Sequence, residues 1–242
     1  PNDPATRREV EKVREELGRG EAVVTPADGP TNKADCLNWV LQGVRLFEKE
    51  HGMKFEIFLM HDAEDVIHPL SLLYYNYLMP KIDFIQVPVF PFPGRWNDFT
   101  TGVYMDEFAE NHTKQMRVRE LVAEVIPSAG VGTALSRRCL DYIAAQTDNQ
   151  VFDISSVTED YLMGLRLQNF PGKKIFLQQE VRLDPALKSK APVATREYFP
   201  PTFKASIRQK SRWIMGISLQ GCSYYVCKGK LGTNYFLFRD RK

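Results

Sequence analysis

The sequence predicts an α/β protein in which a mostly parallel sheet is flanked by helices. Short apolar runs, typical of buried strands, alternate with longer segments whose apolar residues recur at helical spacing. The connections between them are short, and this alternation favours a parallel sheet with helices packed on its faces. The chain has 242 residues, of which 43% are hydrophobic, as expected for one large globular domain or two small ones.

The N-terminal part of the chain is expected to contain two helices and a short strand. The stretch TRREVEKVREELGRG predicts an exposed amphipathic helix with Thr6 as its N-cap, Glu9 completing a capping box, and Gly18 near its end. The stretch EAVVTP is expected to be a short strand. A second helix is predicted after the turn at DGPTNK, because five apolar residues recur on one face: Leu37, Val40, Leu41, Val44 and Phe47.

The rest of the chain continues the alternation of strands and helices. Strands are expected at FEIFLM (55–60), at DFIQVPVF (83–90) and within KKIFLQQEVRLD (173–184). Helices are expected over 69–80, from about 103 to 125, after a small-residue turn within 127–143, from about 158, and over 200–221. Pro88 indicates the edge or the end of its strand, because proline cannot donate a ladder hydrogen bond.

Composition excludes several classes of protein. The net charge is only +2, which argues against a nucleic-acid-binding protein. The spacing of the four cysteines, Cys36, Cys139, Cys222 and Cys227, fits no common zinc pattern, and reduced thiols are expected. No apolar run approaches the ~20 residues of a spanning helix, and no signal peptide is recognised.

An acidic cluster follows the strand at 55–60, in the sequence HDAED. Asp62 and Glu64 are two residues apart, and Asp65 is next to them. In α/β sheets ligands bind outside the carboxyl ends of strands. Mg²⁺ and Mn²⁺ prefer oxygen ligands, and Mg²⁺ is usually held by one or two carboxylates together with substrate phosphates. The alternative is a solvated acidic loop, since Asp and Glu are mostly exposed.

A second acidic group, Thr158-Glu159-Asp160, stands at a predicted helix start. Threonine followed by two acids is a good helix cap, and this is the structural interpretation. The functional interpretation makes Asp160 a general base that takes a proton from an attacking hydroxyl.

The basic helix carries Gln209, Arg212 and Trp213, whose spacing places them on one helical face. Arginine offers a fork of donors to phosphate, and tryptophan offers a flat face to a sugar or to other side chains. The alternative is an interfacial helix whose basic and apolar residues lie on an anionic membrane. Both interpretations can hold on different faces of the helix.

Two further stretches are candidates for ligand contact. The small residues of PSAGVGTALSRR (127–138) permit close backbone approach, but the Gly-Lys-Ser/Thr ending of a phosphate-binding loop is missing, and a tight turn is the alternative. Lys33 precedes a predicted helix and is a candidate phosphate contact, or simply an exposed lysine. His61 and His68 are interpreted as neighbours of the acidic loop and not as metal ligands.

Together, these motifs resemble the family-2 glycosyltransferases, and among them the processive, membrane-embedded branch of the cellulose, chitin and hyaluronan synthases. The resemblance rests on the order Asp-x-Glu, small-residue turn, Thr-Glu-Asp and Gln-x-x-Arg-Trp over nearly the whole chain. Five stretches are similar to glycosyltransferase domains of phage adsorption proteins of Gram-negative bacteria: NKADCLNW, HDAEDVIHP, DEFAENH, PSAGVGTALSRR and SVTEDYLMGLRL. The implied fold is GT-A-type, Rossmann-like, with a C-terminal amphipathic interface helix.

The resemblance assigns roles to individual residues. The catalytic group is Thr158, Glu159 and Asp160, with Asp160 as base. The metal ligands are Asp62 and Glu64, and the expected cofactor is Mg²⁺ or Mn²⁺. The donor and its diphosphate are expected to contact Asp3, Lys33, Asp62, Gln209 and Arg212. The acceptor is expected to contact Trp213, Ser128 and Gly130. Glu64 stands where the family has a second Asp, and its longer side chain could shift the metal preference or leave part of the binding to Asp65.

The resemblance also implies an organisation and a function. Residues 1–200 are expected to form the catalytic domain, whose first strand would precede Pro1, and 201–242 the interface helix and membrane-proximal segment. The expected enzyme is an inverting hexosyltransferase that moves a sugar from a UDP-sugar to a growing saccharide. It would work in a membrane-bound polysaccharide synthase on the cytoplasmic face of the bacterial inner membrane, with an outer-membrane or export partner, and would make or serve as a phage receptor.

Two alternatives come from other classes of protein. One is a non-catalytic, glycosyltransferase-like module that binds nucleotide or supports adsorption; the acids at Asp62 and Asp160 argue against it. The other is a metal-dependent phosphotransferase or nuclease, which would need more carboxylates and a basic groove.

Overall fold

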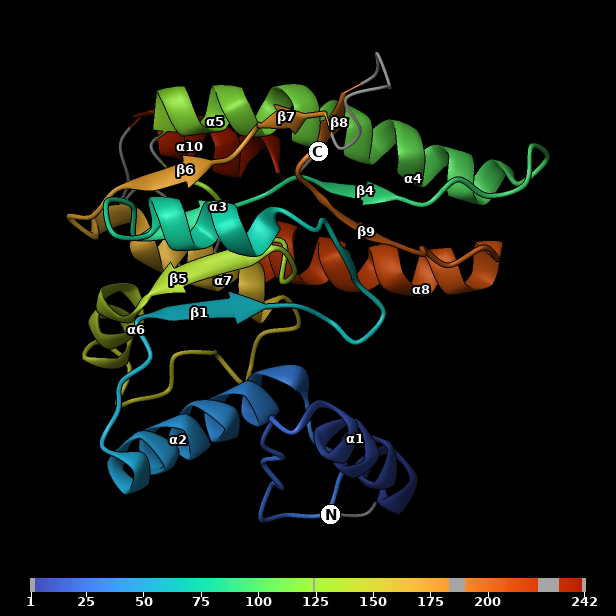
Figure 1. Cartoon of the computed structure of the whole chain (residues 1–242). Helices are drawn as coiled ribbons and strands as arrows, with labels where there is room; N and C mark the ends of the chain where they lie inside the picture. The colour runs from blue at the N-terminus through green and yellow to red at the C-terminus, as the bar shows by residue number, and fades with distance from the viewer. Residues whose placement is uncertain (1–2, 124, 183–189, 222–230, 241–242) are drawn as a thin grey trace. The chain divides into compact units, whose positions relative to one another are not determined.

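The computed structural model describes residues 3–123, 125–182, 190–221 and 231–240 (Figure 1). Cys222 and Cys227 therefore lie outside the described residues. The chain divides into two compact units: the first is Pro1–Phe55 with Phe152–Ile154, and the second is Glu56–Val151 with Ser155–Lys242. The expected functional boundary near residue 200 is a different kind of division, and it remains a prediction.

The first unit contains the two expected helices. α1 spans Pro4–Leu17 and ends at Gly18, which has a left-handed φ of 63°. Its N-cap is Asp3 and not Thr6: the Asp3 carboxylate accepts hydrogen bonds from the Thr6 amide (3.0 Å) and hydroxyl (2.7 Å), and these bonds lower the pKa of Asp3. The proline at N1 explains this earlier start. The strand expected at residues 21–26 is irregular backbone.

α2 spans Lys33–His51, with Asn32 as its N-cap. The buried Asn38 side chain donates to the Phe152 carbonyl (2.8 Å) and accepts from the Phe152 amide (3.0 Å). The Asn32 side chain donates to the Ile154 carbonyl (2.8 Å). These bonds across more than a hundred residues explain why 152–154 belong to the first unit.

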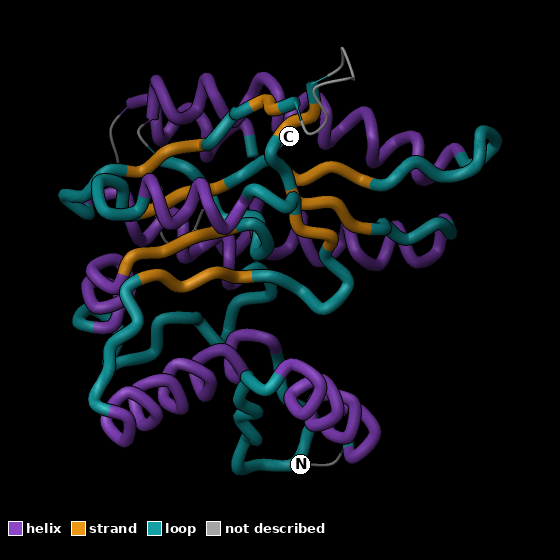
Figure 2. Tube along the Cα trace, viewed as in Figure 1, coloured by secondary structure: helices purple, strands orange, loops and turns teal. Residues whose placement is uncertain are grey.

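The second unit is built on a four-stranded mixed sheet with the order β1-β5-β3-β6 (Figure 2). Its strands are β1 Ile57–Met60, β5 Thr133–Ser136, β3 Phe84–Gln86 and β6 Lys174–Phe176. β5 is antiparallel to both β1 and β3, and β3 is parallel to β6, so three of the four strands run in one direction. The expected α/β class is confirmed.

β5 was not expected from the sequence, which indicated a turn leading directly into a helix. Its residues TALS are all buried, so no alternation of apolar and polar residues marks them as a strand. The last residue of β5, Ser136, caps α6, Arg137–Ala144, by accepting a hydrogen bond from the Cys139 amide (3.2 Å).

The expected strand at 83–90 is two strands in two sheets. β3 ends at Gln86, and after Val87 and Pro88 the chain forms β4, Val89–Pro91. β4 is parallel to β9, Thr195–Glu197, which is antiparallel to β2, Val66–Ile67. A separate pair consists of β7, Glu180–Val181, and β8, Ala191–Pro192. Pro88 marks the strand end as predicted.

Helices complete the second unit. They are α3 Ser71–Leu78, α4 Phe99–Glu110, the π-helix η1 Asn111–Gln115, α5 Met116–Ala123, α7 Glu159–Arg166, the 3₁₀ turn η2 Leu167–Asn169, α8 Phe203–Trp213, the π-helix η3 Ile214–Gln220 and α10 Leu231–Arg239. Tyr75 of α3 and its C-cap residue Met79 pack on Ile85 and Ala134 of the sheet. A second apolar cluster joins α5, α7 and α10. None of the helices in the described ranges is long and apolar enough to cross a membrane.

Candidate active site

One edge of the main sheet gathers most of the predicted site residues. β1 and β3 end where β5 begins, because Met60 and Gln86 both pair with Thr133. β6 ends at the same edge, since Phe176 pairs with Gln86. The acidic turn after β1 and the small-residue loop before β5 therefore leave the sheet at the same edge, where ligands of α/β folds bind.

The acidic turn is held by Asp65. Its fully buried carboxylate accepts from the Asp62 amide (3.0 Å) and bonds to Nδ1 of His61 (2.9 Å). Oδ1 of Asp65 and Nε2 of His61 are also buried, and neither has a hydrogen-bond partner in the described part of the chain. Asp65 thus shapes the turn, while Glu64 is exposed and Asp62 is half-buried. His61 is a neighbour of Asp65, as the sequence indicated.

The donor set of this turn fits a cation shared with a substrate. Within the described residues, no three His, Cys, Asp or Glu side chains are grouped so as to hold a metal by themselves. Asp62 and Glu64 supply two carboxylates at the sheet edge, which is the usual protein share of a Mg²⁺ site completed by phosphate oxygens. The buried Oδ1 of Asp65, which has no hydrogen-bond partner among the described residues, adds local negative character to the turn.

The Gln86 side chain fixes the small-residue loop at 128–132 by hydrogen bonds to its backbone. The sequence had not indicated this role for Gln86. The fully buried Gln86 side chain donates to the Val131 carbonyl (2.9 Å), and it accepts from the Ala129 amide (2.9 Å) and the Thr133 hydroxyl (2.7 Å). The Ser128 hydroxyl bonds that of Thr133 (2.8 Å) and accepts from the Gly130 amide (3.1 Å). A glutamine inside an apolar strand was the available sequence signal, because a buried amide must be satisfied.

Asp160 faces this loop from the first turn of α7. Its Oδ1 accepts from the Tyr161 amide (2.7 Å), which fixes the carboxylate. Gly130 has φ 78°, and a Cβ added there would lie 2.4 Å from Oδ2 of Asp160. Only glycine fits this position, since both the conformation and the space exclude a side chain. The loop and the Thr-Glu-Asp group are therefore in contact.

Thr158 does not act as the expected side-chain cap. It occupies the N-cap position of α7, but its hydroxyl makes no capping hydrogen bond. Oγ1 is buried and has no partner within the described ranges. The cause is close packing: a Cβ added at Gly216 of η3 would lie 2.1 Å from Oγ1 of Thr158. The Thr158 side chain thus packs against η3, the helix that follows the Gln-x-x-Arg-Trp motif. It does not face solvent and does not cap α7.

The three residues of the Gln-x-x-Arg-Trp motif differ in burial and in their contacts. The Gln209 side-chain oxygen accepts from the Tyr104 hydroxyl (2.7 Å), so Gln209 joins α8 to α4. Arg212 is exposed. Trp213 is half-buried among aromatic rings, with centroid distances of 6.1 Å to Tyr104, 6.1 Å to Phe108 and 6.3 Å to Phe199. These contacts leave Trp213 at the wall of a cavity.

The cavity has a volume of about 240 Å³ and lies within the second unit. Its walls include four predicted site residues: Ser128, Thr158, Asp160 and Trp213. The π-helix η1 contributes Asn111, His112 and Gln115. The sequence assigned none of them to the site, although the stretch DEFAENH, one of those that carry the resemblance, includes Asn111 and His112. Carboxylate, amide and imidazole groups beside aromatic rings are suited to a hydroxyl-rich ligand.

A buried polar cluster closes one side of the cavity. Nη1 of Arg119 donates to Asp240 (2.7 Å), and its guanidinium lies 5.7 Å from the Tyr161 ring centroid and 5.4 Å from that of Phe236. The Tyr161 hydroxyl donates to the same Asp240 oxygen. Burial raises the pKa of Tyr161, so the phenol keeps its proton as a donor. Because these residues are far apart in sequence, no local pattern could reveal the cluster.

His112 is a second buried group in the cavity wall. Its Nδ1 lies 2.8 Å from the Val89 amide nitrogen and 2.9 Å from the Val89 oxygen. Burial lowers the pKa of His112 to about 4, and the backbone contact with Val89 opposes this only in part. The imidazole is therefore neutral at neutral pH.

We expect this neutral histidine to make stability depend on pH. In the unfolded chain His112 binds a proton below about pH 6.5, whereas in the folded chain it does so only near pH 4. Stability is therefore lost as the pH falls through this window, by roughly 3 kcal/mol in total. Urea unfolding of the wild type and His112→Asn, which cannot titrate, should give curves that diverge between pH 7 and pH 4. Parallel curves would contradict the assignment.

The predicted site residues thus lie in several places. Asp160, Thr158, Ser128 and Trp213 line one cavity, and Gly130 abuts Asp160. Asp62 and Glu64 follow β1 at the sheet edge. Glu159 is buried at the start of α7, and on α8 Gln209 bonds Tyr104 while Arg212 is exposed. Lys33 and Asp3 belong to the first unit, where Lys33 begins α2 and Asp3 caps α1.

Comparison with known proteins assigns the class to which this fold and site belong. The sequence model of the family described as "Glycosyl transferase family group 2" matches residues 57–242. The match covers most of the chain, and the chain belongs to this family, as the motifs had indicated.

Two curated relatives are similar over the full chain. They are "Bacteriophage adsorption protein B" of Escherichia coli strain K12 and "Bacteriophage N4 adsorption protein B" of Escherichia coli O157:H7. Each is 45% identical over 253 residues, and the alignment covers 100% of this chain and 34% of the relative. The chain thus spans about a third of the length of these relatives. The resemblance to phage adsorption proteins is confirmed.

A solved structure described as a mycobacterial protein is also similar. It covers 78% of this chain and 69% of its own, with 13% identity and a TM-score of 0.30. A similarity at this level supports no inference about fold or function.

Proposed function

We propose that this domain catalyses inverting transfer of a hexosyl group from a UDP-sugar to a saccharide acceptor. One observation carries the proposal. Asp160, a half-buried carboxylate, lines a cavity together with Trp213 and Ser128, and it touches Gly130. A carboxylate base, an aromatic face and a loop of small residues that meet at one cavity are suited to the attack of a sugar hydroxyl.

The reaction follows from these groups. An acceptor hydroxyl, positioned against Trp213, attacks the anomeric carbon on the side opposite the diphosphate. The bond between the acceptor oxygen and the anomeric carbon forms as the bond to the phosphate oxygen breaks, and UDP leaves with the electron pair. Asp160 takes the hydroxyl proton. A single base and direct displacement give inversion at the anomeric carbon.

The leaving group needs positive charge beside it. The proposal gives Arg212 and Gln209 to the diphosphate. Asp62 and Glu64 would hold Mg²⁺ or Mn²⁺, which when bound supplies electrostatic stabilisation to the departing diphosphate. Glu159, buried next to Asp160, adds a carboxylate to the first turn of α7, where the helix dipole favours negative charge.

The proposal also concerns a longer protein like the two relatives, in which this domain would be one part. There the domain would form part of a membrane-bound polysaccharide synthase on the cytoplasmic face of the bacterial inner membrane. Flanking segments would attach it to the membrane, residues 201–242 would form the interface, and an outer-membrane or export partner would receive the product. The two relatives are named for bacteriophage adsorption, which supports a role of the protein or its product as a phage receptor.

The experiment that tests the proposal measures UDP release from a panel of UDP-sugars with Mg²⁺ or Mn²⁺. We expect metal-dependent release, and we expect Asp62→Ala to weaken metal-dependent UDP binding about tenfold or more in calorimetry, since a ligand of a shared cation is lost. Glu110→Ala is a matched control, because Glu110 is an exposed carboxylate on α4. Unchanged UDP affinity in Asp62→Ala would remove Asp62 from the site. UDP binding without release from any donor would favour a non-catalytic module.

A further inference from the structure

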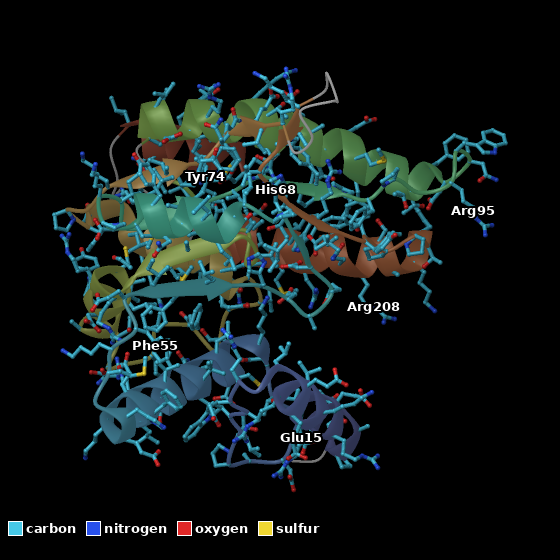
Figure 3. The ribbon with its side chains drawn as sticks, viewed as in Figure 1. Glu15, Phe55, His68, Tyr74, Arg95 and Arg208 are labelled. Carbon is cyan, nitrogen blue, oxygen red and sulfur yellow. The ribbon has the colours of Figure 1, made fainter. Side chains whose placement is uncertain are left out.

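The π-helix η1 interrupts the long helical stretch from α4 to α5. Its defining hydrogen bond runs from the Met116 amide to the Asn111 carbonyl, five residues back along the chain. In Figure 3 this stretch runs along the top of the second unit and carries side chains on both its outer and its inner side. Single π turns inside α-helices are rare and frequently occur at functional sites. η1 is such a turn, and it forms part of the cavity wall.

Two contacts from outside the helix hold η1 in place. The Gln178 side chain, just beyond β6, donates to the carbonyls of His112 (2.8 Å) and Thr113 (3.2 Å). The buried His112 ring meets the backbone of Val89 in β4, with Nδ1 at 2.8 Å from the amide nitrogen. The side chains of η1 that line the cavity are therefore carried by a fixed backbone, as precise recognition of a ligand requires.

Two amide side chains of η1 are available to a ligand. Asn111 and Gln115 both line the cavity. Within the part of the chain that the structure describes, neither side chain makes a hydrogen bond, whereas the guanidinium of Arg119 in the same wall is bonded to Asp240. An amide both donates and accepts hydrogen bonds, so it suits a hydroxyl group, which does the same.

The charged groups around the cavity are mostly acidic. Among the described residues that line it, four are acidic and one is basic: Glu107, Asp160, Glu197 and Asp240 against Arg119. Lys210, which is not part of the wall, pairs with Glu107, so the acids still outnumber the bases by four to two. An anionic group brought against this wall meets charges of its own sign, and such contacts are strongly unfavourable.

We propose that Asn111 and Gln115 determine acceptor specificity by hydrogen-bonding the hydroxyl groups of an uncharged hexose, and that the acidic wall rejects a uronic acid. The inference rests on the proposed function, because this hexose would be the terminal sugar of the acceptor, held against Trp213. Neither amide can neutralise a carboxylate, so the two features of the wall act in the same direction.

Saturation-transfer NMR with the 242-residue chain measures sugar binding without any transfer step. The probes are the methyl glycosides of glucose, galactose and mannose and those of the three corresponding uronic acids, with and without UDP and Mg²⁺. We expect at least one neutral hexoside to bind, and its uronide to bind at least about tenfold more weakly. Asn111→Ala and Gln115→Ala should each weaken hexoside binding about fivefold, since each removes a hydrogen bond between neutral groups.

A gain of binding separates recognition from misfolding. Gln115→Lys places a positive charge in the wall, and it should strengthen uronide binding about fivefold while weakening that of the hexoside. The matched control is Gln42→Ala, which removes an exposed glutamine of α2 that does not line the cavity. It should bind every probe as the wild type does.

The proposal is overturned if no neutral hexoside binds, if hexosides and uronides bind equally, or if both alanine variants bind like the wild type. Failure of the proposed function looks different. Hexoside binding that depends on both amides, without UDP release from any donor, would contradict sugar transfer and keep the recognition by η1. Metal-dependent UDP release with unchanged hexoside binding in both variants would keep the transfer and contradict the role of η1.

Discussion

Asp160→Asn is expected to retain UDP binding and to lose sugar transfer by about 10²- to 10⁴-fold, the usual contribution of a positioned general base. The substitution keeps the shape of the side chain. The asparagine oxygen can still accept from the Tyr161 amide, as Oδ1 of Asp160 does at 2.7 Å, so α7 should begin as before. What is lost is the ability of the other carboxylate oxygen, beside Gly130, to take a proton.

Two measurements separate this explanation from a general defect. Calorimetry with UDP and metal should give wild-type affinity for Asp160→Asn, while single-turnover transfer from a donor that supports UDP release is lost. Asp141→Asn, which neutralises an exposed carboxylate on α6, should leave both unchanged. Full turnover in Asp160→Asn would refute the base assignment.

The second large effect is expected from Gly216→Ala. The added Cβ would lie 2.1 Å from Oγ1 and 2.7 Å from Cβ of Thr158, closer than side-chain atoms approach. The π-helix η3 must then move away from α7, and Trp213, three residues earlier in the chain, must move with it. Because a displacement of about 1 Å can cost about a hundredfold in rate, transfer should fall about 10²-fold.

Gly102→Ala is the matched control, since Gly102 also lies in a helix but has no atom within 4 Å of an added Cβ. It should preserve activity and should not lower the melting temperature, because alanine is the better helix former. Thermal melts of both variants identify any loss caused by unfolding. Activity of Gly216→Ala within twofold of wild type, in a folded protein, would mean that this packing does not position Trp213.

The sequence predicted the secondary-structure elements that carry the candidate site residues, because each is marked by a pattern of a few neighbouring residues. Asp62 follows a strand, Asp160 begins a helix, and Trp213 lies on a basic helix, and all three elements are present. The strand, β1, was expected to be buried, but as an edge strand it is only partly so. These residues could be found because an acid at a strand end, or a motif at helical spacing, is a pattern within a few residues. The prediction that the Thr158 side chain caps α7 was wrong because a distant residue decides its environment. The Thr158 side chain packs against Gly216, which is 58 residues away in the chain, where no local pattern could show it.

By itself, the sequence determined the α/β class, the family, most helix positions and the strand segments at 55–60, 83–90 and 173–184, because periodicity and short motifs can be read within a few residues. Only the tertiary structure decided that β5 runs antiparallel between β1 and β3, that Gln86 holds the loop beneath Asp160, and that η1 and Arg119 complete the cavity. These features depend on contacts between residues tens of positions apart. Such contacts are selected by the packing of the whole unit, in which buried polar groups must find partners wherever the chain brings them.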